Sequence, residues 1–340
     1  MNSSKSTNII ISVLILIIFS ILSIASIELI GQKLIFKGRL YFVNNIDHWN
    51  NPAQLDINSD CIRSQFEADY FRKNDYTVIF LGDSYIFGWL LPPQQSIPQQ
   101  FEGIARKAYP HKNIKAANFG WVSSSPLLSY RLLESIGEKY QPDLVILGID
   151  MTDFHDDIKY QRLLERKGIY RLLDVCPITV LCLKHLLQMT GLDQVHKLIF
   201  GFPRRRFFIT EQPLPESMRW LKYIRNNIER INHFCRTKLR ARFLVIVLPR
   251  SFQYNDLESP QNWEKKDYPD SDRYIHEPFK WFDQIATEVE YPIFSLLPIF
   301  QNTKIYPTCF YDDPHWTELG NRVAAEAIFE YLRDNGYFEQ

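Results

Sequence analysis

Ser84, His315 and an aspartate beside the histidine are the residues of this sequence best suited to nucleophilic catalysis. A serine hydroxyl is a poor nucleophile near neutral pH and needs a base to accept its proton. Histidine suits that role because its pKa lies near neutrality, and its second ring nitrogen needs a carboxylate to fix the tautomer. Asp312, three residues before His315, is predicted to be that carboxylate, and Asp313 is the alternative.

The predicted secondary structure places these residues at strand ends or just before a helix. Short apolar runs rich in Val, Ile and Phe predict strands, and amphipathic segments between them predict helices. Because strands that alternate with helices form βαβ units, the sequence predicts an α/β fold with a mostly parallel sheet covered on both faces. The strands are expected at residues 76–81, 115–120, 143–148, 242–248 and 292–295, and the helices at 99–109, 127–140, 218–239, 279–289 and 319–334.

Three sequence blocks resemble the SGNH (GDSL-type) hydrolase superfamily, whose members are esterases and acyl-transfer enzymes. The blocks are Gly82-Asp83-Ser84 after the first predicted strand, Asn118-Phe119-Gly120 after the second, and Asp312-Asp313-Pro314-His315 before the last helix. The resemblance covers roughly residues 76–153 and 243–332. It implies a flavodoxin-like three-layer α/β/α fold with the site at the carboxyl ends of the strands.

The resemblance also implies a role for each site residue. Ser84 is expected to be the nucleophile, His315 the general base and Asp312 the acid that orients it. The backbone N–H groups of Ser84 and Gly120 are expected to form an oxyanion hole. This chemistry requires no metal ion and no organic cofactor.

The end of the third strand departs from the family pattern. Family members usually have Asn-Asp there, and alignment through Pro142-Asp143 puts Thr152 at the position of the oxyanion-hole asparagine. Threonine offers one short hydroxyl donor, and losing such a donor typically costs ~10²–10³ in turnover. An alignment that puts Asp150 there is disfavoured because an ionised carboxylate would repel the oxyanion. Thr152 is therefore expected to be the third, weaker donor.

The N-terminal segment is predicted to cross or enter a membrane. No charged residue occurs from Ser6 to Ile27, which is about the ~20 apolar residues that a spanning helix needs. An uncleaved single-pass anchor is favoured, although the small residues Ser23, Ala25 and Ser26 leave a cleaved signal as the alternative. Positive charges flank both sides of the segment, so they do not fix its orientation. We expect the body to be exported, to the periplasm or another extracytoplasmic space.

The predicted domain organisation has three parts. Residues 1–30 form the anchor or signal, residues 31–74 a polar connector, and residues 75–340 the hydrolase-like domain with an insertion at about 155–220. The apolar stretch Ile178–Leu187 is too short to span a membrane and is expected to cover the core or the site. Arg204-Arg205-Arg206 is expected to be a solvated basic loop, with contact to anionic lipid or glycan as the alternative.

Composition and motifs exclude several other classes. Lys and Arg number 39, as do Asp and Glu, so no surplus of positive charge favours nucleic acid. Neither G-x-G-x-x-G nor a P-loop follows a predicted strand, which argues against a nucleotide-binding protein. The five cysteines contain no C-x-x-C pair, and His155-Asp156-Asp157 is expected to be a solvated loop, not a metal site.

These observations predict a membrane-anchored serine esterase or acyl-transfer enzyme. Export of the site favours O-acylated carbohydrate of the envelope or extracellular space as the substrate, and lipid esters are the second candidate. The rival is a catalytically degenerate module of the same fold that binds glycan or holds a partner at the membrane, and Thr152 is the feature in its favour. The acyl group, the acceptor and the oligomeric state are not fixed by the sequence.

Overall fold

The computed structural model describes residues 3–35, 56–71, 76–165, 205–267 and 273–339, together with seven separate residues between 178 and 195. Contacts divide the chain into two units. The first comprises Met1–Asn50 and Arg162–Arg204, and the second comprises Asn51–Gln161 and Arg205–Gln340. The second unit holds the sheet and all of the predicted site residues.

Five parallel strands form one sheet in the order β2-β1-β3-β4-β5. Nearly every residue of the four long strands is buried, as expected for a parallel sheet covered on both faces. This is the flavodoxin-like order, in which the chain reverses direction across the sheet between β1 and β3. The strands are β1 (Tyr76–Gly82), β2 (Ile114–Gly120), β3 (Leu144–Ile149), β4 (Arg242–Val247) and β5 (Ile293–Ser295). The predicted three-layer α/β/α fold is therefore confirmed.

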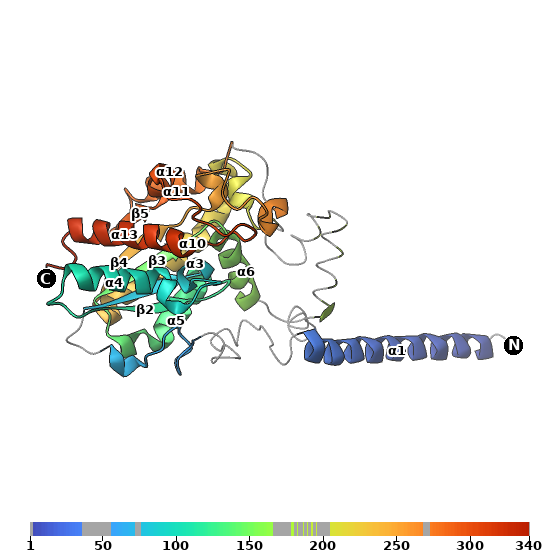
Figure 1. The fold of residues 1–340 in the computed structure, drawn as a ribbon. Helices are drawn as coiled ribbons and strands as arrows, with labels where there is room; N and C mark the ends of the chain where they lie inside the picture. The colour runs from blue at the N-terminus through green and yellow to red at the C-terminus, as the bar shows by residue number, and fades with distance from the viewer. Residues whose placement is uncertain are drawn as a thin grey trace. The chain divides into compact units, whose positions relative to one another are not determined.

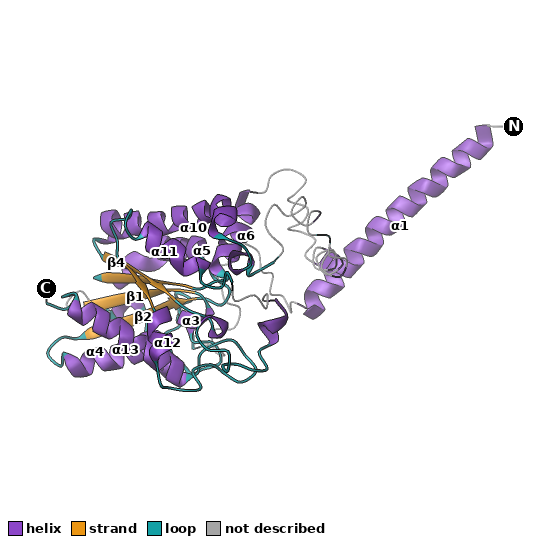
Figure 2. Cartoon of the chain, turned by 90° about the horizontal axis from the view of Figure 1, so that it is seen from above, coloured by secondary structure: helices purple, strands orange, loops and turns teal. Residues whose placement is uncertain are grey.

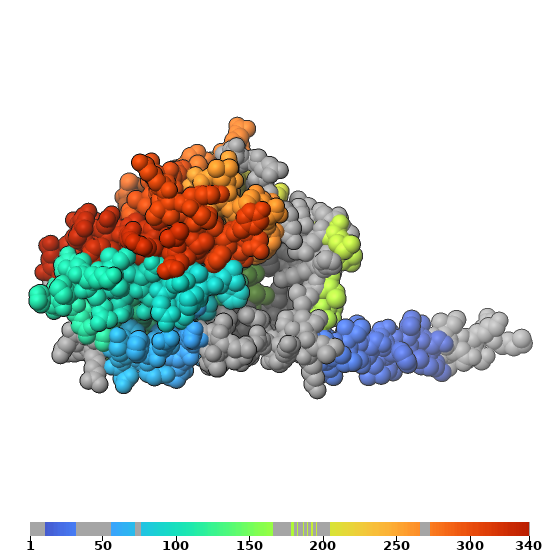
Figure 3. Space-filling view, in the orientation of Figure 1, coloured from blue at the N-terminus to red at the C-terminus, as the bar shows by residue number. Residues whose placement is uncertain are grey.

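Helices cover both faces of this sheet (Figures 1 and 2). One face carries α5 (Pro126–Ile136), α6 (Asp153–Glu165), α10 (Leu214–Phe234) and α11 (Glu277–Ile285). The other carries α3 (Ser84–Phe87), α4 (Ile97–Ala108), α12 (Leu297–Asn302) and α13 (Glu318–Asp334). The last helix packs directly on α4, so the red and blue-green surfaces adjoin in Figure 3.

Two predicted segments differ from the structure. Residues 56–71 of the predicted polar connector pack on the second unit, where Ile62 is fully buried. Arg63 is also buried, and its guanidinium donates to the carbonyls of Phe87 and Gly88, directly after α3. A basic residue in a polar run gave no sign that it would be buried, because the carbonyls that accept its hydrogen bonds come from a distant part of the chain.

The predicted insertion at about 155–220 is narrower in the structure. Its first residues belong to α6 and its last to α10, and residues 162–204 group with the first unit. The described part of Ile178–Leu187 includes Ile178, whose N–H donates to the carboxylate of Glu28 on the N-terminal helix at 3.0 Å. Of this stretch only Ile178, Thr179, Cys182 and Leu186 are described, so the expected cover over the core or the site lies outside the described residues.

The N-terminal helix α1 extends over Ser3–Ile35. Within it, Ile11–Gly31 is 21 residues long, has a mean hydropathy of 2.8 and is 6% buried, so it is long and apolar enough to cross a membrane. A signal sequence meets the same criteria. Among the cysteines that the structure describes, Cys61, Cys182, Cys235 and Cys309 are not in disulfide bonds.

Candidate active site

Ser84 lies at a sharp turn between β1 and α3. Gly82 ends the strand with a φ of +153°, and a Cβ atom there would lie 2.5 Å from a side-chain carbon of Ile86, so only glycine fits without strain. The Asp83 carboxylate then accepts the N–H of Tyr85 at 2.9 Å and caps the short helix. The turn places Ser84 at the carboxyl end of β1, beside the point where the strand order reverses.

His315 lies next to Ser84, as the sequence predicted. The distance between its Nε2 atom and the Ser84 Oγ atom is 2.7 Å, although 231 positions separate the two residues. Both side chains are largely buried, with 7% of Ser84 and 9% of His315 exposed. A hydroxyl and an imidazole at this distance can exchange a proton directly.

Asp313, and not Asp312, is the carboxylate that contacts His315. Asp313 Oδ1 lies 2.5 Å from His315 Nδ1 and also accepts the backbone N–H of His315 at 3.0 Å. Asp312 is exposed. The predicted spacing of three residues was wrong because Asp313 forms a local turn with the N–H two residues on, which brings its carboxylate alongside the imidazole.

The environment of Asp313 favours its ionised form. Burial alone would raise its pKa, but hydrogen bonds from His315 and Trp263 outweigh burial and hold the pKa below its usual value. The Trp263 Nε1–H group donates to Asp313 Oδ2 at 3.0 Å, so both carboxylate oxygens have partners. The carboxylate is therefore charged near neutral pH and can stabilise an imidazolium on His315.

Tyr85 joins the serine to the histidine loop. Its fully buried hydroxyl donates to the carbonyl of Pro314 at 2.8 Å. Its ring centroid lies 5.2 Å from that of His315 and 4.8 Å from that of Trp316. Sequence reasoning missed this residue because nothing in a tyrosine after a serine indicates a partner 229 positions away.

The other expected oxyanion donors are engaged within the protein. The Gly120 N–H donates to the Asn118 side-chain oxygen at 2.9 Å, and the Thr152 hydroxyl donates to Asp150 at 2.7 Å. Thr152 has one hydroxyl proton, so a donor role toward substrate requires breaking that bond. The Ser84 N–H, at the first position of α3, has no acceptor within its helix.

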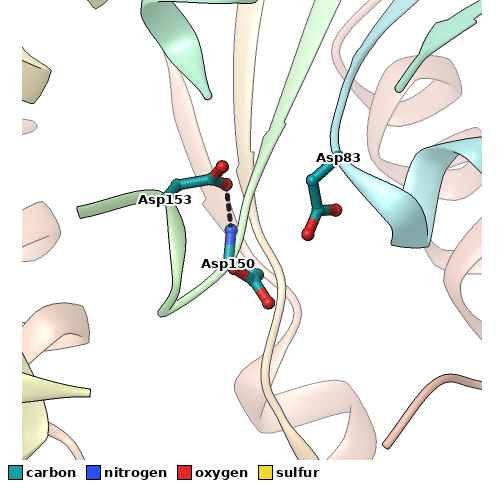
Figure 4. Close-up of side chains that lie close together, drawn as sticks. All are labelled: Asp83, Asp150 and Asp153. Carbon is teal, nitrogen blue, oxygen red and sulfur yellow. Dashed lines mark hydrogen bonds between the residues drawn. The ribbon is translucent and has the colours of Figure 1, made fainter. Parts of the chain in front are cut away.

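Three buried carboxylates lie close together at the carboxyl ends of β1 and β3 (Figure 4). Asp83, Asp150 and Asp153 each place an oxygen within 4.8 Å of the others. Asp153 accepts the backbone N–H of Asp150 at 2.8 Å, as the dashed line in Figure 4 marks. Asp150 in turn is paired with Arg250, whose Nε lies 2.7 Å away.

Arg250, in the loop after β4, neutralises part of the negative charge of these carboxylates. It is 1% exposed, and it pairs with Glu264 as well as with Asp150. Arg206 extends the network by pairing with Glu264 at 2.8 Å, whereas Arg205 is exposed and Arg204 of the expected basic loop lies outside the described residues. Sequence reasoning missed Arg250, although its place just after a strand end could have indicated a site residue.

His155 and the two acids after it are buried in α6 and do not form the expected solvated loop. Asp156 pairs with His155 and with Lys159, and Asp157 accepts the N–H of Leu127 at 2.7 Å. Each buried acid therefore has a protein partner, which lowers the cost of burying it.

Burial and the charge of Asp150 raise the pKa of Asp83 to about 8. Between about pH 4 and pH 8 the folded protein therefore keeps a proton on Asp83. The unfolded chain has lost that proton, because an aspartate there has its ordinary pKa near 4. This contribution to stability is complete below about pH 4 and is lost as the pH rises toward 8.

We therefore expect the Tm of Asp83→Asn to increase relative to the Tm of the unaltered protein as the pH rises. The amide cannot ionise and keeps an oxygen for the Tyr85 N–H. The difference in Tm should widen by at least about 3 °C between about pH 5 and pH 8, since 1 kcal/mol shifts Tm by about 2–4 °C in a domain of this size. Thermal unfolding at both pH values measures it, with the exposed Asp312→Asn as control. A difference that stays constant would show that Asp83 does not titrate in this range.

Comparison with known proteins finds similar structures but no similar sequence. No family model matches the chain, and no curated protein matches it. One similar structure is a lipolytic protein of the G-D-S-L family from Desulfitobacterium hafniense DCB-2, at 13% identity and a TM-score of 0.43, with 75% of this chain and 99% of that chain covered. Another is the lipase/acylhydrolase from Enterococcus faecalis, at 12% identity and a TM-score of 0.44, with 76% and 96% covered.

A third similar structure is the acetyl xylan esterase AlAXEase, at 13% identity and a TM-score of 0.42, with 75% of this chain and 99% of that chain covered. Lipolytic G-D-S-L proteins and esterases are thus among the solved structures similar to this chain. At these identities the similarity concerns the fold. The chemistry of this chain rests on its own side chains.

Proposed function

We propose that this protein is a serine hydrolase of the SGNH type that cleaves or transfers ester-linked acyl groups. The observation that carries the proposal is the continuous contact from the Ser84 hydroxyl through His315 to the Asp313 carboxylate. A nucleophile, a base and an orienting acid in hydrogen-bond contact are the arrangement that activates a serine.

Each residue has a defined part in the proposed reaction. Ser84 Oγ attacks the ester carbonyl carbon while its proton passes to His315 Nε2. Asp313 holds the proton on Nδ1 and stabilises the imidazolium that forms. The Ser84 N–H donates to the developing oxyanion. His315 then protonates the departing alcohol, and water or a sugar hydroxyl attacks the acyl-enzyme in the second half of the reaction.

Thr152 is expected to contribute little as an oxyanion donor, because its hydroxyl proton is already given to Asp150. Thr152→Val keeps the shape of the side chain and removes the hydroxyl. It should lower kcat by less than about tenfold, against the ~10²–10³ typical of a lost donor. Steady-state hydrolysis of p-nitrophenyl acetate measures the effect. A loss of a hundredfold or more would restore Thr152 to the oxyanion hole.

The site and the N-terminal helix together favour an extracytoplasmic substrate. We place O-acylated carbohydrate first because a single-pass anchor with an exported body brings the site to the envelope or extracellular space. Lipid esters come second. Protease added to intact cells tests the orientation of the anchor. Digestion of the second unit would show that it lies outside the cytoplasmic membrane.

The rival function is glycan binding or scaffolding by a catalytically degenerate member of the fold. The engagement of Gly120 N–H and Thr152 hydroxyl within the protein favours it, since fewer donors remain for an oxyanion. The experiment that decides is an assay of the full-length protein in detergent against p-nitrophenyl acetate, O-acetylated oligosaccharides and lipid esters. The proposal predicts acetate release that depends on Ser84. Binding of an acetylated glycan with no release from any ester would support the rival.

A further inference from the structure

Exposed aromatic rings lie on the loop that carries Asp313 and on the segment that contacts this loop. Trp263, Tyr306 and Tyr311 are 49%, 55% and 65% exposed, and we call these three residues the aromatic platform. Scattered single apolar residues on a surface are ordinary. Three large exposed rings on two hydrogen-bonded segments next to a reactive site are not, and such exposure indicates a surface that binds a ligand.

Hydrogen bonds hold the loops of the aromatic platform together next to the triad. The Trp263 indole N–H donates to Asp313, and Asp313 in turn contacts His315. The N–H of Gln261 donates to the carbonyl of Tyr311 at 3.0 Å, and the Tyr306 hydroxyl donates to the carbonyl of Leu257 at 3.1 Å. A ligand that contacts Trp263 would therefore lie beside Asp313, whose carboxylate contacts His315.

We infer that the aromatic platform binds the sugar rings of a neutral, O-acylated oligosaccharide and presents its ester to Ser84. This inference rests on the proposed function. One face of a pyranose ring carries C–H groups, which pack on the electron-rich face of an aromatic ring. Tryptophan and tyrosine give such a surface at little entropic cost because their side chains have few rotatable bonds.

The charges of the same two loops favour a neutral ligand over an anionic one. Within residues 255–265 and 303–317, where the side chains are described, the exposed charged groups are two acids, Asp256 and Asp312, and two bases, Lys265 and Lys304. These charges balance, so an anionic lipid surface or a uronic acid chain would gain no net attraction. Exposed aliphatic side chains are limited to Leu257 and Ile305 in the described part of these loops, which favours stacking over insertion of an acyl chain.

Binding to the catalytically inert Ser84→Ala chain tests this inference. The full-length variant is titrated with an O-acetylated xylo-oligosaccharide by calorimetry, with and without Tyr311→Ala or Trp263→Ala. We expect each ring removal to weaken the affinity by about tenfold or more, as stacking contacts do elsewhere. The control is Phe66→Ala, which removes a ring that is 46% exposed on another segment, and it should leave the affinity unchanged.

Two results would overturn the inference. One is an affinity that neither Tyr311→Ala nor Tyr306→Ala alters, and these variants spare the hydrogen bond from Trp263 to Asp313. The other is equal or tighter binding to acetylated polygalacturonate or to anionic phospholipid vesicles. Failure of the proposed function is distinguishable, because it appears as absent ester hydrolysis by the unaltered chain and does not depend on binding to Ser84→Ala.

Discussion

Ser84→Ala should lower the kcat for p-nitrophenyl acetate by about 10⁶-fold, to the level left by binding and the oxyanion donors. The variant removes the atom that forms the acyl-enzyme and leaves His315 without the proton it is placed to accept. The backbone of α3 and its cap by Asp83 do not involve the serine side chain beyond a long contact of 3.4 Å, so the fold should be retained.

The matched control is Ser96→Ala, which removes a fully buried serine hydroxyl at the start of α4. It costs one hydrogen bond to the carbonyl of Pro93, about 1 kcal/mol of stability, and should leave kcat nearly unchanged. Turnover by folded Ser84→Ala within about tenfold of the unaltered protein would remove Ser84 from the mechanism.

Asp313→Asn should lower kcat by about 10⁴-fold, while Asp312→Asn should change it by less than about threefold. An amide at position 313 donates where a carboxylate accepts, so it favours the wrong tautomer of His315 and cannot stabilise the imidazolium. Asp312 is exposed, and its charge is screened by water and salt. Parallel measurement of kcat and thermal stability for the two variants separates the catalytic effect from unfolding.

The two variants also distinguish the acid predicted from the sequence, Asp312, from the acid that contacts His315 in the structure, Asp313. If Asp312→Asn were the inactive variant and Asp313→Asn the active one, the loop would adopt a different turn during catalysis, as the family-like spacing predicts. Equal losses in both would mean that the loop as a whole, and not one carboxylate, supports His315.

The strands and the nucleophile–base pair could be predicted from the sequence because their signals are local. The run Tyr76–Leu81 is rich in β-branched and aromatic residues and is followed by a glycine, and the observed β1 extends it by one residue. Gly336, just beyond the end of α13, has a φ of +68°, a left-handed conformation that favours glycine after a helix. Ser84 follows the first strand and His315 precedes the last helix, so their meeting follows from the fold.

The choice of acid and the charge network behind the serine could not be predicted in the same way. Asp312 and Asp313 differ by one position, and only the turn geometry decides which faces the imidazole. Arg250 pairs with Asp150 across 100 positions, and Arg206 joins through Glu264. Such pairs depend on which loops the sheet brings together, which no local pattern encodes.

Labelling with a fluorophosphonate tests the central claim most directly, because this reagent reacts with a serine hydroxyl that a base has activated. Intact mass and peptide mapping of the full-length protein should show one adduct, on the peptide that contains Ser84. His315→Ala should slow its formation by several orders of magnitude in a protein that remains folded. A folded, unaltered chain that gives no adduct at Ser84, or labels equally fast without His315, would contradict the account.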